Sequence, residues 1–163
     1  GHDRPGIIAS TTGRLADLGL NIEDSTMTLL RGQFAMMLVC AGEATAAAIE
    51  EALAPIAADG TLSVAVREVS AGAEAAPAAG GWVLTVHGGD RAGIVSTVVS
   101  EVAAVGGNIT DLTTRLAGDL YLLIAEIDLP AGVDADALGA SIRTAAAALG
   151  VGATLRPAEA DDL

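Results

Sequence analysis

Apolar residues recur along the second half of the chain with two different periods. Between residues 92 and 105 they fall three or four positions apart, the spacing of one helix face, and residues 82–87 (WVLTVH) form a short β-rich run. The pattern predicts strands at 82–87, 108–117, 120–129 and 151–156 and helices at 92–105 and 134–149. The order β-α-β-β-α-β is the split βαβ arrangement, which predicts a four-stranded antiparallel sheet with two helices on one face.

The first half of the chain repeats the second half. Residues 1–8 (GHDRPGII) return as 88–95 (GGDRAGIV), and residues 19–24 (GLNIED) return as 106–111 (GGNITD). Both blocks return 87 positions later (88 − 1 and 106 − 19), so the copies stay in register without a gap. For the first copy the pattern predicts helices at 5–18 and 43–58 and strands at 21–30, 33–41 and 61–69.

We therefore predict an α+β chain of two ferredoxin-like βαββαβ units. The first covers 1–69 and the second 82–157, while 70–81 form a flexible linker and 158–163 a tail. The first unit lacks its first strand, because the sequence begins at the turn that should follow it, and this leaves an unpaired sheet edge. Three explanations stay open: a segment that precedes Gly1 in a longer chain, residues that a structure leaves out, or a strand supplied by another chain. We favour the first two together.

Both faces of the strand expected at 33–41 are apolar. Phe34 and Leu38 occupy one face, whereas Met37 and Val39 occupy the other. An antiparallel sheet with helices on one side usually carries polar residues on its other side. We therefore expect the second face to be covered, either by the other copy or by a second chain, which predicts a homodimer.

The acidic charge of the chain limits the classes of partner that it can bind. It has 8 Lys and Arg against 21 Asp and Glu, a formal net charge of −13 and a pI near 4.2. Binding phosphates requires clustered basic residues, so this balance argues against direct contact with nucleic acid or an anionic membrane surface. A single cysteine, Cys40, the lack of an apolar stretch of membrane-spanning length and the lack of a secretory leader predict a cytoplasmic protein without a membrane segment.

The start of each copy carries a family resemblance. The sequence His-Asp-Arg-Pro-Gly-Ile opens a helix and is followed by Gly-x-Asn-Ile at the start of the next strand. This combination resembles the ACT domain, a small regulatory fold that senses amino acids. The first copy looks most like the tandem ACT proteins of the glycine cleavage system transcriptional repressor family, and the resemblance covers both copies, essentially everything outside the linker and the tail.

The resemblance implies a small amino-acid ligand in the turn between the first strand and the first helix, often at an interface between two domains. The ligand-binding residues that it implies are Asp3, Arg4, Pro5, Gly6, Asn21, Asp90, Arg91, Gly93 and Asn108. Ala92 stands where the family usually has proline, which loosens the second loop.

Elementary chemistry supports the same site. A turn that feeds a helix N-terminus offers unpaired N–H groups and partial positive charge, which suit an α-carboxylate. Gly6 and Gly93 let a ligand approach the backbone, and Asp3 and Asp90 can accept from an α-ammonium group. We expect these groups, with the asparagine amides, to converge on a zwitterion. A second interpretation makes the same residues ordinary caps and turn formers.

Metal binding, nucleotide binding and nucleophilic catalysis have weak support in the sequence. His2 and His87 fall at different positions of the repeat and are expected to be solvated turn residues, and no cluster of ligands has metal-binding spacing. The glycines of residues 88–93 lack the spacing of a dinucleotide or Walker loop, and no nucleophile elbow is present. The sequence therefore predicts no catalytic residue, no metal site and no cofactor.

The favoured hypothesis is a non-enzymatic regulatory protein that binds a small amino acid and modulates a protein partner. The resemblance suggests transcriptional control of amino-acid metabolism, and an acidic chain without a DNA-reading motif would act there through a protein. Two alternatives stay open: the chain is the regulatory portion of a larger amino-acid or one-carbon metabolic enzyme, or it is a dimerisation module without a ligand.

Overall fold

The computed structural model describes residues 1–69 and 81–158. These residues form two compact units, unit 1 within Gly1–Gly72 and unit 2 within Ala73–Leu163. The predicted linker, apart from Gly81, and the predicted tail, apart from Ala158, lie outside the described residues.

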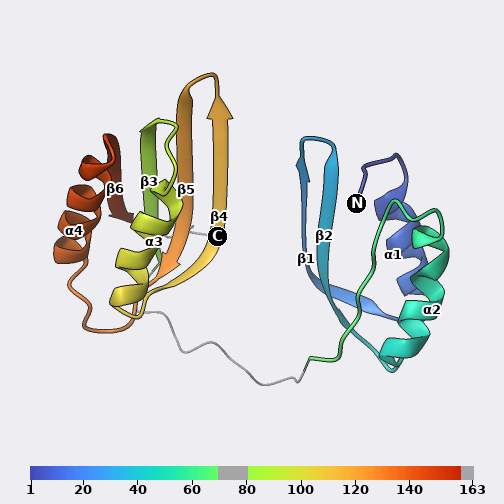
Figure 1. The fold of residues 1–163 in the computed structure, drawn as a ribbon. Helices are drawn as coiled ribbons and strands as arrows, with labels where there is room; N and C mark the ends of the chain where they lie inside the picture. The colour runs from blue at the N-terminus through green and yellow to red at the C-terminus, as the bar shows by residue number, and fades with distance from the viewer. Residues whose placement is uncertain (70–80, 159–163) are drawn as a thin grey trace. The chain divides into compact units, whose positions relative to one another are not determined.

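Unit 2 has the complete predicted architecture. Its elements in chain order are β3 (Gly81–Gly89), α3 (Ile94–Ala104), β4 (Asn108–Ala117), β5 (Leu120–Asp128), α4 (Ala135–Ala148) and β6 (Val151–Pro157). The strands form one antiparallel sheet in the order β4-β5-β3-β6, and both helices cover the same face of it (Figure 1). The predicted α+β, ferredoxin-like fold is therefore confirmed, with element ends that differ from the prediction by at most two residues.

The core of unit 2 follows from the two periods of its sequence. Alternate side chains of β3 and β5 point towards the helices, and Leu84, Val86 and Leu123 are completely buried there. On α3 the buried positions recur every four residues, as Ile94, Val98 and Val102. The remaining members of this core are Ala125, Ile127, Leu129, Leu138, Ile142, Ala146, Val151 and Ala153.

Unit 1 repeats the second to fifth elements of unit 2. They are α1 (Ile7–Asp17), β1 (Asn21–Leu30), β2 (Gln33–Ala41) and α2 (Ala46–Ala57). Both units shift register at the same position of the repeat, between Ile22 and Asp24 and between Ile109 and Asp111. The main core cluster of unit 1 is smaller and consists of Leu15, Leu20, Leu53 and Ile56.

The strand predicted at 61–69 is wrong, because the structure assigns no strand to these residues. In unit 2 the corresponding strand, β6, pairs with β3 alone. Among the described residues of unit 1, the counterpart of that pairing strand is limited to Gly1 and His2, since the isolated bridge between His2 and Gln33 matches the pair of Gly89 and Leu120. Within the described part of the chain, residues 61–69 therefore have no neighbouring strand with which to pair.

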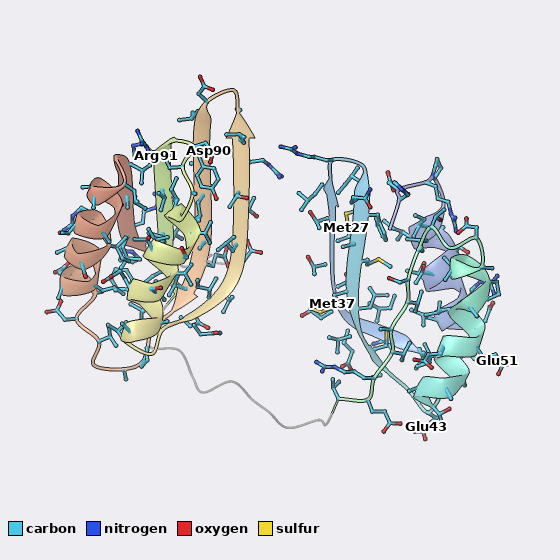
Figure 2. The ribbon with its side chains drawn as sticks, viewed as in Figure 1. Met27, Met37, Glu43, Glu51, Asp90 and Arg91 are labelled. Carbon is cyan, nitrogen blue, oxygen red and sulfur yellow. The ribbon has the colours of Figure 1, made fainter. Side chains whose placement is uncertain are left out.

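The outward faces of both sheets carry exposed apolar side chains. Met37 of β2 is 68% exposed and points away from α1 and α2 (Figure 2). In unit 2 Leu120 and Ile124 of β5 are 55% and 41% exposed. The apolar second face expected from the sequence is thus present on each unit.

Candidate ligand-binding site

The first helix of each unit begins at a glycine in the left-handed conformation. Gly6 has φ 89° and Gly93 has φ 92°, and no side chain among the described residues caps α1 or α3. The second helices differ, because Thr45 Oγ1 accepts from Ala48 N at 3.3 Å and an Asp134 carboxylate oxygen caps α4 in the same way. The starts of α1 and α3 therefore present N–H groups that none of the described side chains satisfies.

Backbone hydrogen bonds hold these turns at the hairpin end of each sheet. The amide of Asp3 donates to the carbonyl of Gly32 at 3.1 Å, and the amide of Asp90 donates to the carbonyl of Asp119 at 3.3 Å. Gly32 and Asp119 lie in the turns that join β1 to β2 and β4 to β5. Figure 2 shows Asp90 and Arg91 at this end of unit 2.

The two asparagines of the expected site lie at the opposite end. Asn108 begins β4 and pairs with Asp128, whereas the Asp90 turn lies beside the other end of the same strand, at Asp119. Nine residue steps along β4 span about 30 Å. Asn21 has the same relation to Asp3 in unit 1, because it begins β1. The expected convergence of these groups on one zwitterion therefore does not occur within a single unit.

Arg4 ties the turn of unit 1 to the end of α2. Its guanidinium forms an ion pair with Asp59, donates to Thr61 Oγ1 at 3.0 Å and donates to the carbonyl of Ile56 at 2.7 Å. A cation is favourable at a helix C-terminus, where carbonyl groups carry partial negative charge. The pKa of Asp59 is held below its usual value, first by the hydroxyl and amide hydrogen bonds from Thr61 and then by Arg4.

Arg91 occupies the same position of the repeat in unit 2, but it lies over an open groove. The groove has a volume of about 660 Å³ and is widely open to solvent. Its lining consists of Arg91, Ala92, Ala147, Ala148, Leu149 and Gly150. Sequence reasoning named Arg91 but missed the end of α4 as its neighbour. The paired left-handed glycines Gly60 and Gly150 could have indicated that end.

A second hollow of about 410 Å³ lies between α3 and α4. Glu101 and Asp134 belong to its lining, and Ser141 donates a hydrogen bond to Glu101. Of the residues that the structure describes, two carboxylates and no basic side chain line this hollow, so it is a poor place for the carboxylate of a ligand.

The remaining chemical groups are not assembled into a centre. Across residues 1–69 and 81–158, no three His, Cys, Asp or Glu side chains come together as a metal site. His2 lies beside Gln33, with Nδ1 3.2 Å from Nε2, and the His87 ring lies against the backbone of Gly152. None of the helices in this described part combines the length and apolar character that crossing a membrane requires.

Comparisons with known proteins agree with this architecture. A family model described as ACT domain matches residues 1–67. The UPF0237 protein of Corynebacterium diphtheriae is 34% identical over 70 residues, which cover 41% of this chain and 79% of that protein. The UPF0237 protein of Streptococcus pneumoniae is 44% identical over 43 residues, or 26% of this chain and 49% of that protein. The chain thus spans about half the length of this second relative.

Two solved structures match nearly the whole chain. An unknown protein from Galdieria sulphuraria has a TM-score of 0.81 and 27% identity, with 97% of this chain and 94% of that chain covered. A candidate glycine cleavage system transcriptional repressor has a TM-score of 0.66 and 17% identity, with 97% and 92% covered. The second likeness is one of fold alone.

Proposed function

Because the chain belongs to the ACT domain family, we propose that it is a non-enzymatic regulatory protein that binds a small amino acid at the turn before the first helix of a unit. The carrying observation is the difference between the helix starts. The side chains of Thr45 and Asp134 cap the N-termini of α2 and α4. In contrast, α1 and α3 begin at Gly6 and Gly93 without a side-chain cap among the described residues. Their first N–H groups suit a carboxylate.

The asparagine contacts of the proposed site come from a second unit. A ligand in the Asp90 turn cannot reach Asn108 of the same unit, because these residues lie at opposite ends of β4. In the proposed homodimer the ligand is therefore shared between the turn of a unit in one copy of the chain and the strand start of a unit in the other copy. Exposed apolar side chains such as Met37 and Ile124 favour association of the sheets.

Ligand binding then changes how the protein docks on a protein partner. This requires the amino acid to bind one arrangement of units more tightly than another. A net charge of −13 favours a protein over nucleic acid as that partner. The motif resemblance points to transcriptional control of amino-acid metabolism as the process served.

The test is a thermal-unfolding screen of the chain against the twenty standard amino acids. An amino acid that binds only the folded protein raises the free energy of unfolding by about 2.7 kcal/mol at about 100 times its Kd. We expect a response to one or a few small amino acids, and a sedimentation experiment should show the same ligand stabilising the dimer. If none of the twenty amino acids raises the melting temperature, the proposal is contradicted and a dimerisation module without a ligand is favoured.

Variants of the asparagines test the shared site. Asn108→Ala and Asn21→Ala should weaken binding of the responsive amino acid, whereas the control Thr113→Ala, an exposed residue within β4, should not. Equal binding by all three variants would show that the asparagine assignment is wrong.

A further inference from the structure

The two units hold the same arginine in different surroundings. In unit 1 the Arg4 guanidinium has three partners, the Asp59 carboxylate, the Thr61 hydroxyl and the Ile56 carbonyl. In unit 2 the Arg91 side chain has no hydrogen-bonding or ion-pairing partner among the residues that the structure describes. Both arginines precede the first helix of their unit, 87 positions apart (91 − 4).

The difference arises at the end of the second helix. Left-handed Gly60 and Gly150, each with φ 73°, follow α2 and α4 and align the two ends. On this alignment Leu149 stands where unit 1 has Asp59, and Val151 stands where it has Thr61. Both side-chain partners of the arginine are therefore replaced by apolar residues in unit 2, and only the helix carbonyls remain as acceptors.

The space at Arg91 suits one kind of ligand. A guanidinium binds a carboxylate with a fork of two N–H donors, and in unit 1 Arg4 is already paired with the carboxylate of Asp59. Among residues 1–69 and 81–158, no acidic side chain lines the groove and satisfies Arg91 in place of a ligand. The last carbonyl groups of α4, at Ala147 to Leu149, carry partial negative charge and suit an ammonium group.

We propose that the groove beside Arg91 in unit 2 binds the α-carboxylate of the small amino acid, and that the Asp59 side chain fills the corresponding place in unit 1. This inference rests on the proposed function and deepens it. Each chain then takes one ligand through an arginine, at unit 2, and unit 1 carries a built-in carboxylate that blocks the equivalent contact. The alanine and leucine side chains of the lining leave room for a small aliphatic side chain and offer no partner for a charged one.

Exchanging the two environments tests the proposal with the full chain. Leu149→Asp places the carboxylate of unit 1 beside Arg91 and should abolish binding of the amino acid found in the screen. Asp59→Leu removes the carboxylate that occupies Arg4 and leaves its contacts with the Thr61 hydroxyl and the Ile56 carbonyl. It should raise the calorimetric stoichiometry from one ligand per chain to two. Arg91→Ala should weaken binding by about tenfold to hundredfold, the loss expected for hydrogen bonds to a charged group.

The controls separate a site effect from a loss of folding. Arg115→Ala removes an equal charge from β4 and should bind as the original chain does, and circular dichroism should show all variants folded. If the original chain binds an amino acid and Leu149→Asp binds it equally well, the inference fails while the proposed function stands. A stoichiometry of one ligand per chain for Asp59→Leu would also overturn the inference. If the original chain binds none of the amino acids, the inference and the proposed function are both overturned.

Discussion

Gly1 and Phe34 are hydrogen-bonded to each other in both directions. The Gly1 amino group donates to the Phe34 carbonyl at 2.9 Å, and the Phe34 amide donates to the Gly1 carbonyl at 2.7 Å. In unit 2 the corresponding residues, Gly88 and Tyr121, form a pair of the β3–β5 ladder. The start of unit 1 is therefore in register for a strand between β2 and residues 62–69.

A strand added in that register should complete unit 1. Joining a copy of residues 81–87 (GWVLTVH) to Gly1 places counterparts of Leu84 and Val86, both completely buried in unit 2, over α1 and α2. Burial of each such side chain contributes about 1.5–3 kcal/mol. We expect a higher melting temperature for unit 1 and slower amide exchange along β2 and residues 62–69.

The control for this extension is the same segment shortened by its histidine. Loss of one residue turns every side chain to the other face of the sheet, so the apolar set would face outwards. Equal gains in amide protection from both extensions would show that the effect does not arise from strand pairing.

Two glycines of unit 1 should respond in opposite directions to alanine substitution. Gly6 has φ 89° and open space where an added Cβ would stand, so Gly6→Ala should cost about 1 kcal/mol through backbone strain alone. Gly13 lies inside α1, also with open space, so Gly13→Ala should stabilise the helix by about 0.5–1 kcal/mol. Amide exchange along α1 measures both changes, and a shift of the same sign for both would contradict the conformational argument.

Sequence periodicity was sufficient to predict most elements of the fold. Strands 21–30, 33–41 and 108–117 have the predicted ends, because tight turns and glycines delimit them locally. The strand at 61–69 could not be predicted in this way. Its residues have a suitable composition, but a strand requires a hydrogen-bonding neighbour, and among the described residues that neighbour is limited to Gly1 and His2.

The candidate site was harder to predict, for a geometric reason. The motif places Asp90 and Asn108 close in the sequence, on either side of α3, yet the helix between them separates them, and they lie at opposite ends of the unit. The contacts of Arg4 depend on Asp59 and Thr61, more than fifty positions away, so no local pattern indicates them. Contacts between residues far apart in the sequence therefore decide which motif side chains remain available to a ligand.

The Arg4–Asp59 contact should make unit 1 sensitive to acid. The pKa of Asp59 is lowered by the Thr61 hydrogen bonds first and by Arg4 next, so the folded state favours the charged carboxylate. The stabilisation it gives is therefore present above the unfolded pKa of about 3.9 and is lost as the pH falls through the lower folded pKa. Thermal unfolding of Asp59→Asn should differ from the original chain near neutral pH and converge with it in acid.

Glu51→Gln is the control for this experiment. Glu51 lies on α2 of the same unit and is exposed, and the Arg4 side chain does not bond to it. Removing the Glu51 charge should leave the loss of unfolding free energy at acidic pH unchanged. An NMR titration of the Asp59 carboxyl carbon checks the cause directly, and a midpoint at or above the ordinary value would contradict it.

Cys40 should react slowly with alkylating reagents. Burial raises the pKa of its thiol, and the charge of Glu23, which stands at the register shift of β1, raises it further. Because the thiolate is the reactive form, iodoacetamide at about pH 8 should modify Cys40 more slowly than a free cysteine. Glu23→Gln removes one cause and should speed the reaction, whereas Glu43→Gln, an exposed change outside the strands, should not. Since Cys40 is the chain's single cysteine, mass spectrometry reports its rate alone, and equal rates for both variants would contradict the electrostatic contribution.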